Sequence, residues 1–107
     1  MDIDGIAHDI LKDGLDDWVP IDRLIGYAQQ RNPDGYHELV REVLTHLFNE
    51  GLTEAGRFGD NGYSPEGASR ELLSIVIADC ESLGWNPQGG GYWLSNTKEG
   101  DRVASAL

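Results

Sequence analysis

The stretch from Trp18 to Phe58 constrains the possible folds more than any other part of this chain. Within it, apolar residues recur at intervals of three and four in two successive blocks, which predicts amphipathic helices over 20–31 and 36–50. The intervening Asn-Pro-Asp-Gly at 32–35 favours a turn, because proline disfavours helical backbone in the residue before it. A glycine and an alternating segment follow, so the whole stretch predicts helix, turn, helix and strand.

The flanking segments add three helices and one strand. The apolar residues near the N-terminus are spaced as on one helix face, which predicts an opening helix over about 3–13. Ser64 and Pro65 predict the start of a further helix, with Ser64 as its N-cap, that continues to about Leu83. A second strand is predicted at 92–95. A last short helix follows, with the apolar residues Val103, Ala104 and Leu107.

Pairing of the strands at 52–58 and 92–95 predicts a small antiparallel sheet. The helix from Ser64 is then inserted between the two paired strands. The expected fold class is α+β and mostly helical, in one domain over residues 1–107, because a chain of this length builds a single modest core.

The core stretch and the terminal segment Tyr-Trp-Leu-Ser-Asn-Thr-Lys-Glu-Gly-Asp-Arg-Val-Ala, at 92–104, resemble the winged helix-turn-helix superfamily. In that superfamily an aromatic-rich strand, Thr-x-x-Gly and a closing helix commonly end the wing. The resemblance covers nearly the whole chain except 59–91, and it implies a winged helix with an extra helix between the wing strands. It implies a fold and does not identify a function.

The charge of the chain is strongly negative. Nineteen acidic residues against eight basic ones give a net charge of −11, and seven aspartates face only Lys12 in the first 22 residues. A field of this sign repels nucleic acid and attracts basic surfaces. The charge therefore has two interpretations: it keeps the protein soluble, or it guides a basic protein partner.

Four of these aspartates, together with a tryptophan, form the candidate partner-binding site. Asp9, Asp13, Asp16 and Asp17 are predicted to cluster at the end of the first helix and in the turn after it, with Trp18 alongside. Trp18 also has a second interpretation, as a core residue between the first helix and the strands.

Three segments are similar to small acidic bacterial proteins, some of which look like immunity partners of secreted toxins. They are Asp-Asp-Trp-Val-Pro-Ile at 16–21, Val-Arg-Glu-Val-Leu-Thr-His-Leu-Phe-Asn-Glu-Gly-Leu-Thr-Glu-Ala-Gly at 40–56, and Gly-Tyr-Trp-Leu at 91–94. The similarity implies a cytoplasmic antidote that binds and blocks a cognate toxin. It carries over no individual binding residue.

A DNA-binding transcriptional regulator of winged-helix type is the alternative function. The helix over 36–50 would then enter the major groove. The residues that could contact DNA are Arg31, His37, Arg41, Thr45 and Arg57. The same helix also presents Glu38 and Glu42, whereas affinity for phosphates comes from several Lys or Arg contacts. Nucleic acid is therefore an unfavoured partner.

Enzyme and metal chemistry have little support. His37 and His46 are nine residues apart, which is not the spacing of a helical metal pair, and Gly89–Gly91 lacks the Gly-Lys-Ser/Thr of a phosphate-binding loop. Cys80 falls among apolar residues at helical spacing and is expected to be a small buried hydrophobe. We expect a protein without enzyme activity, cofactor or metal.

The sequence also suggests where the protein is found. No stretch approaches the roughly 18 apolar residues of a membrane span. The acidic N-terminus lacks the charged and apolar regions of a secretory signal. We therefore expect a cytoplasmic protein with no membrane partner.

Overall fold

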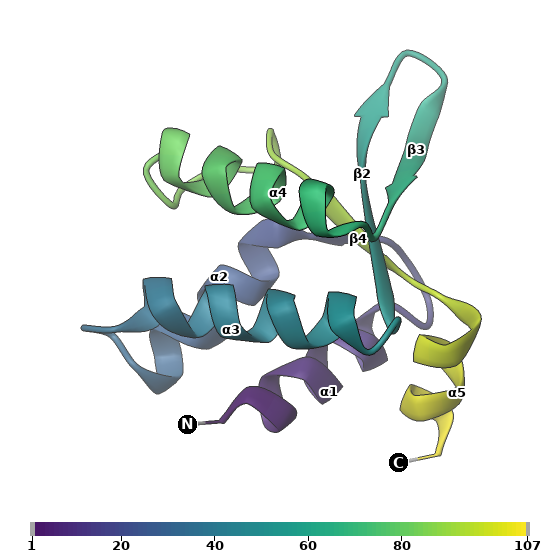
Figure 1. Ribbon diagram of the computed structural model, residues 1–107, viewed down its shortest axis with the longest axis horizontal. Helices are drawn as coiled ribbons and strands as arrows, with labels where there is room; N and C mark the ends of the chain where they lie inside the picture. The colour runs from purple at the N-terminus through teal and green to yellow at the C-terminus, as the bar shows by residue number, and fades with distance from the viewer. Residues whose placement is uncertain (1, 107) are drawn as a thin grey trace.

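The computed structural model describes residues 2–106, which form five helices and a four-stranded antiparallel sheet (Figure 1). The architecture is α+β, as the sequence predicts. The elements in chain order are α1 (Ile3–Asp13), β1 (Val19–Pro20), α2 (Ile21–Arg31), α3 (Tyr36–Asn49), β2 (Thr53–Gly59), β3 (Gly62–Gly67), α4 (Arg70–Ser82), β4 (Trp93–Asn96) and α5 (Lys98–Ser105). Within the described range, no helix has the length and apolar composition that crossing a bilayer requires.

Helices α1, α2 and α3 pack against one another and provide most of the core. Each presents the apolar stripe that its sequence predicts. Their fully buried side chains include Ile6, Ile10, Leu11, Leu24, Val40, Val43 and Leu47. Helix α4 runs alongside α3, and α5 packs on α1 (Figure 1).

Side-chain caps begin three of the helices where local sequence favours them. The Asp2 carboxylate accepts a hydrogen bond from the Gly5 N–H at the start of α1. Thr97 caps α5, the predicted last helix, and its hydroxyl accepts a hydrogen bond from the Gly100 N–H at 3.0 Å. The predicted apolar residue Leu107 lies outside the described residues.

The predicted pairing of the strands at 52–58 and 92–95 is confirmed. Strands β2 and β4 are antiparallel, and their register aligns Thr53 with Asn96 and Ala55 with Leu94. Strand β4 also pairs with the two-residue β1, which gives the strand order β1-β4-β2-β3. A whole helix, α4, lies in the chain between the paired strands β2 and β4.

The predicted helix start at Ser64 is wrong. Ser64 and Pro65 lie in β3, which forms a hairpin with β2 and aligns Tyr63 with Phe58. Helix α4 begins only at Arg70, after the N-cap Ser69. Ser-Pro favours a helix start locally, but an edge strand also tolerates proline, and here the tertiary pairing with β2 decides.

The hairpin bends away from the rest of the sheet at a bulge between Ala55 and Gly56. Glycine is required there because a Cβ on Gly56 would lie 2.2 Å from the Ser64 carbonyl oxygen and 2.7 Å from the Pro65 Cα. In Figure 1 the β2–β3 hairpin accordingly projects beyond the helices. The hairpin residues Phe58 and Tyr63 lie beside Trp18, which precedes β1, and Phe58 also lies beside Trp93 of β4.

Candidate functional site

The sheet has one face in the core and one face outside it. Val19, Leu94 and Ala55 are aligned across β1, β4 and β2, and all three are buried. Because side chains alternate along a strand, the intervening residues point to the other face. Two of them, Glu54 and Trp93, are partly exposed.

Four aromatic side chains from four segments meet on this outer face. Trp18 precedes β1, whereas Phe58, Tyr63 and Trp93 belong to β2, β3 and β4. The Trp18 ring stacks on Tyr63 with centroids 5.0 Å apart, and Phe58 lies 5.3 Å from Trp18 and 4.7 Å from Trp93. The Tyr63 and Ser95 hydroxyls are 2.8 Å apart, which ties the hairpin to β4. We call these four rings the aromatic face.

The aromatic face is not a second core. Trp18 and Phe58 are 45% and 44% exposed. The interpretation of Trp18 as a core residue is therefore wrong; the next residue, Val19, enters the core instead, with 3% of its surface exposed. Aromatic rings that are grouped and partly exposed make this face a candidate interaction site.

A cavity of about 450 Å³ adjoins the aromatic face at Trp18. It lies between the turn after α1 and the beginning of α5. Its lining residues are Gly14, Leu15, Asp16, Asp17, Trp18, Ser95, Asn96 and Asp101. Three carboxylates thus surround a cavity whose apolar wall contains an exposed indole ring.

Asp16 and Asp17 belong to this cavity and form no ion pair within residues 2–106. Asp17 accepts a hydrogen bond from the backbone N–H of Trp18 at 2.8 Å, which orients its carboxylate. Asp101 accepts from the Asn96 amide at 3.0 Å. The structure therefore brings together Asp16, Asp17 and Trp18 of the predicted site.

The other two predicted aspartates connect helices α1 and α2. The Asp13 carboxylate accepts a hydrogen bond from the Tyr27 hydroxyl at 2.6 Å and pairs with Arg23 at 3.2 Å. The hydrogen bond to Asp13 is the main reason that the pKa of Tyr27 is raised. Asp9 pairs with Arg31 at 3.1 Å. Both carboxylates therefore have partners within the chain, and their charge is largely offset.

The arginines predicted for DNA contact also have acidic partners. Ion pairs join Arg31 to Asp2 and Asp9, Arg41 to Glu38 and Glu81, and Arg57 to Asp79. The three arginines lie on α2, α3 and β2, and no shared basic stripe results. Their charge is offset where phosphates would have to bind.

The other two residues predicted for DNA contact are engaged locally on α3. The Thr45 hydroxyl donates a hydrogen bond to the Arg41 carbonyl at 2.7 Å. His37 packs between Tyr36 and Trp85, with ring centroids 3.9 Å and 4.9 Å away. Both side chains therefore already have contacts within residues 2–106.

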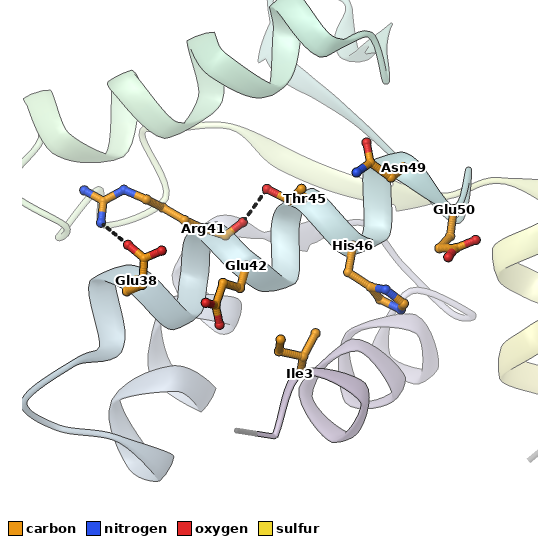
Figure 2. A pocket seen from close by; sticks show the side chains of 8 residues that line it. All are labelled: Ile3, Glu38, Arg41, Glu42, Thr45, His46, Asn49 and Glu50. Carbon is orange, nitrogen blue, oxygen red and sulfur yellow. Dashed lines mark hydrogen bonds and ion pairs between the residues drawn. The ribbon is translucent and has the colours of Figure 1, made fainter.

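The accessible face of α3 borders a second cavity, of about 440 Å³, shown in Figure 2. Figure 2 shows Glu42 and His46 directed from α3 toward Ile3 of α1, while Glu38 turns to Arg41. Its lining residues are Ile3, Glu38, Arg41, Glu42, Thr45, His46, Asn49 and Glu50. Three glutamates against one paired arginine make this face unsuited to phosphate.

Phe58, Tyr63, Trp93 and Asp101 are not predicted as site residues from the sequence. A hairpin signal was present for two of them, because Phe58 and Tyr63 flank the turn sequence Gly-Asp-Asn-Gly at 59–62. Within residues 2–106, no group of three His, Cys, Asp or Glu side chains is arranged to hold a metal ion.

Comparisons of the chain with protein-family models, with curated proteins and with solved structures find no match.

Proposed function

We propose that this chain is a non-enzymatic, acidic module that binds a basic protein, and that it acts as an immunity protein by blocking a cognate toxin. The observation that carries the proposal is the position of Asp16 and Asp17, which have no ion-pair partner within residues 2–106 and lie beside the half-exposed Trp18. The net charge of −11 supports a basic partner.

The unpaired acids and the exposed aromatic rings have different roles in the proposed binding. Unpaired acids at the rim of an interface accelerate encounter with a basic protein, and this effect is strongest at low salt. Exposed aromatic rings supply apolar contact area and commonly carry most of the binding energy. The immunity role itself is supported by the similarity of 16–21, 40–56 and 91–94 to small acidic bacterial proteins.

We also infer that the fold is a variant winged helix. Two observations support this inference: α2, a turn and α3 lead into β2, and β2 pairs with β4, so that these two strands would be the wing strands. The insertion between them is larger than the sequence predicts, because it contains β3 as well as α4.

DNA binding has less support under this inference. The helix α3 would have to enter the major groove, but α4 packs along it and contributes Glu81 to Arg41. The inserted helix α4 therefore packs against the helix that DNA would have to contact, which favours protein binding over DNA binding.

Association kinetics test the proposed function. The first candidate partner is the product of the neighbouring gene, because an immunity protein is encoded beside its toxin. Stopped-flow mixing of the two proteins at low and high ionic strength gives the association rate. We expect Asp16→Asn/Asp17→Asn to slow association about three- to tenfold at low salt and much less at high salt. The dissociation rate should change less.

A matched control removes the same amount of charge from the paired acids. Asp9→Asn/Asp13→Asn leaves Asp16 and Asp17 in place and should slow association less. Identical association rates for the parent and Asp16→Asn/Asp17→Asn at low salt would contradict the proposal, as would the absence of binding to any basic protein encoded nearby.

A further inference from the structure

We infer that the aromatic face and the adjoining acidic cavity form one docking surface, and that it binds an arginine side chain presented by a segment of the basic partner. This rests on the proposed function and names the chemical group that the surface recognises.

The two parts are continuous because they share Trp18 and because Ser95 connects them. Trp18 lines the cavity and also stacks on Tyr63. Ser95 lines the cavity and is within 2.8 Å of the Tyr63 hydroxyl. One surface therefore extends from Asp101 across Trp18 to Phe58.

A partner would contact the face of this sheet rather than add a strand to its edge. The edge strands are β1 and β3. Each contains a proline, Pro20 and Pro65, and β1 has only two residues. Proline has no N–H to donate and short edges give few ladder hydrogen bonds, so strand addition is disfavoured.

A further acidic residue borders this surface on the sheet. Glu54 of β2 is aligned with Ser95 of β4, so both side chains lie on the outer face, where the Ser95 hydroxyl contacts Tyr63. Burial is the main cause of the raised pKa of Tyr63, and the negative charge of Glu54 also raises it. Together with Asp16, Asp17 and Asp101, Glu54 brings four carboxylates to the docking surface.

This distribution of charge selects a cationic occupant. Exposed aromatic rings can stack nucleic-acid bases, but the phosphates between the bases would meet the four carboxylates. A second copy of the chain would bring a charge of −11 against −11. A guanidinium group matches both the aromatic rings and the carboxylates of the docking surface, because it stacks on aromatic rings and forms paired hydrogen bonds with carboxylates.

The same protein uses this combination twice for its own arginines. Arg57 lies over the Tyr92 ring, 4.2 Å from its centroid, and pairs with Asp79 at 3.5 Å. A second arginine, Arg41, lies over the Trp85 ring at 5.1 Å and pairs with Glu81. Trp18 with Asp16 and Asp17 presents the same two components at the surface, where a partner can reach them.

Nuclear magnetic resonance of the indole N–H groups tests the inference. The chain contains Trp18, Trp85 and Trp93, so each ring reports separately. The probes are a Gly/Ser peptide with several arginines, the same peptide with lysines or glutamates in their place, and oligothymidylate. We expect the arginine peptide to shift the Trp18 resonance and leave that of Trp85 unchanged, and to bind more tightly than the lysine peptide.

Variants locate the binding. Trp18→Ala should weaken binding of the arginine peptide about tenfold, since it removes the stacking partner. The matched control is Ile75→Ala, which truncates a side chain that is 51% exposed on α4 and should leave affinity unchanged. Trp18→Phe keeps a ring and should retain most of the binding; circular dichroism confirms that each variant is folded.

Several results would overturn the inference. They are equal affinity for the arginine and lysine peptides, a Trp18 resonance that does not move, and tighter binding of oligothymidylate. The neighbouring gene's product separates this inference from the proposed function. If that protein binds the parent and Trp18→Ala equally well, the docking surface is wrong and the proposed function stands; if no basic protein binds the parent, the proposed function fails.

Discussion

Trp18 stacks on Tyr63 with the ring planes 27° apart, and this contact joins the segment before the first strand to the third strand of the sheet. Strand β3 forms backbone pairs only with β2. The hairpin is joined to the sheet through β2, which pairs with β4, and the aromatic contact and the Tyr63–Ser95 hydrogen bond link β3 to the other strands by side chains. The rings that form the candidate docking surface therefore also stabilise the packing of the hairpin on the sheet.

Two substitutions of Tyr63 should separate these contributions. Tyr63→Phe removes the hydroxyl that lies 2.8 Å from Ser95, and we expect a loss of about 0.5–1.5 kcal/mol. Tyr63→Ala also removes the contacts with Trp18 and Phe58, each of which adds about 0.5–1.5 kcal/mol beyond area burial. Urea unfolding gives both free energies, and hydrogen exchange should show faster opening of β3. Equal stability of the two variants would contradict this account of the hairpin.

A pair of glycine substitutions should change stability in opposite directions. A Cβ at Gly100 would lie 2.0 Å from the Leu52 carbonyl oxygen, so Gly100→Ala must displace α5 from the start of β2 and should cost about 1–3 kcal/mol or more. Gly26, inside α2, has open space around the position of a Cβ. Gly26→Ala should therefore stabilise the protein by about 1 kcal/mol through helix propensity alone. Thermal unfolding measures both; a Gly100→Ala variant as stable as the parent would show that α5 is loosely attached.

Most of the fold could be predicted from local patterns. The apolar stripes of α1, α2 and α3 are regular, the Asn-Pro-Asp-Gly turn is explicit, and the core positions follow from them. Strand β3 could not be predicted in the same way. Its sequence Gly-Tyr-Ser-Pro-Glu-Gly has little apolar alternation, and only the turn sequence at 59–62 indicates its hairpin with β2.

The candidate site was less predictable than the fold, because sequence clustering does not specify ion-pair partners. Asp9 and Asp13 are separated by one helical turn, so both face α2, where Arg31 and Arg23 bind them. Asp16 and Asp17 follow the end of the helix, and no cation of α2 pairs with them. The partners could be assigned only after the packing of α1 on α2 was known.

The buried thiol of Cys80 should make stability depend on pH above neutrality. Burial is the main cause that raises the pKa of Cys80 from 9.0 to about 11, and its side chain is 1% exposed. The folded state therefore retains the proton longer than the unfolded state. Its contribution to stability is complete below about pH 9 and is lost as the pH rises toward 11, by about 2–3 kcal/mol in total.

Urea unfolding across that pH range measures the effect, with Cys80→Ala as the control. The raised pKa values of Tyr27 and Tyr63 act in the same direction at the upper end of the range, so the difference between the parent and Cys80→Ala isolates the thiol. Alkylation by iodoacetamide should likewise be slow in the native state and fast in urea. Rapid native alkylation near neutral pH would mean that α4 exposes this side chain.

DNA binding gives the sharpest test between the two functions considered for this fold. We expect no binding to random duplex tighter than roughly 10⁻⁴ M at physiological salt, because the arginines of α2, α3 and β2 are paired with acids. The matched variant is Arg41→Ala, which removes the one arginine on the helix that would enter the groove. A DNA-binding regulator would lose affinity and part of its salt dependence in this variant, whereas we expect no retardation by either protein in a gel-shift assay. Micromolar binding by the parent, with a steep decrease at higher salt and a loss in Arg41→Ala, would instead favour the regulator over the acidic protein-binding module.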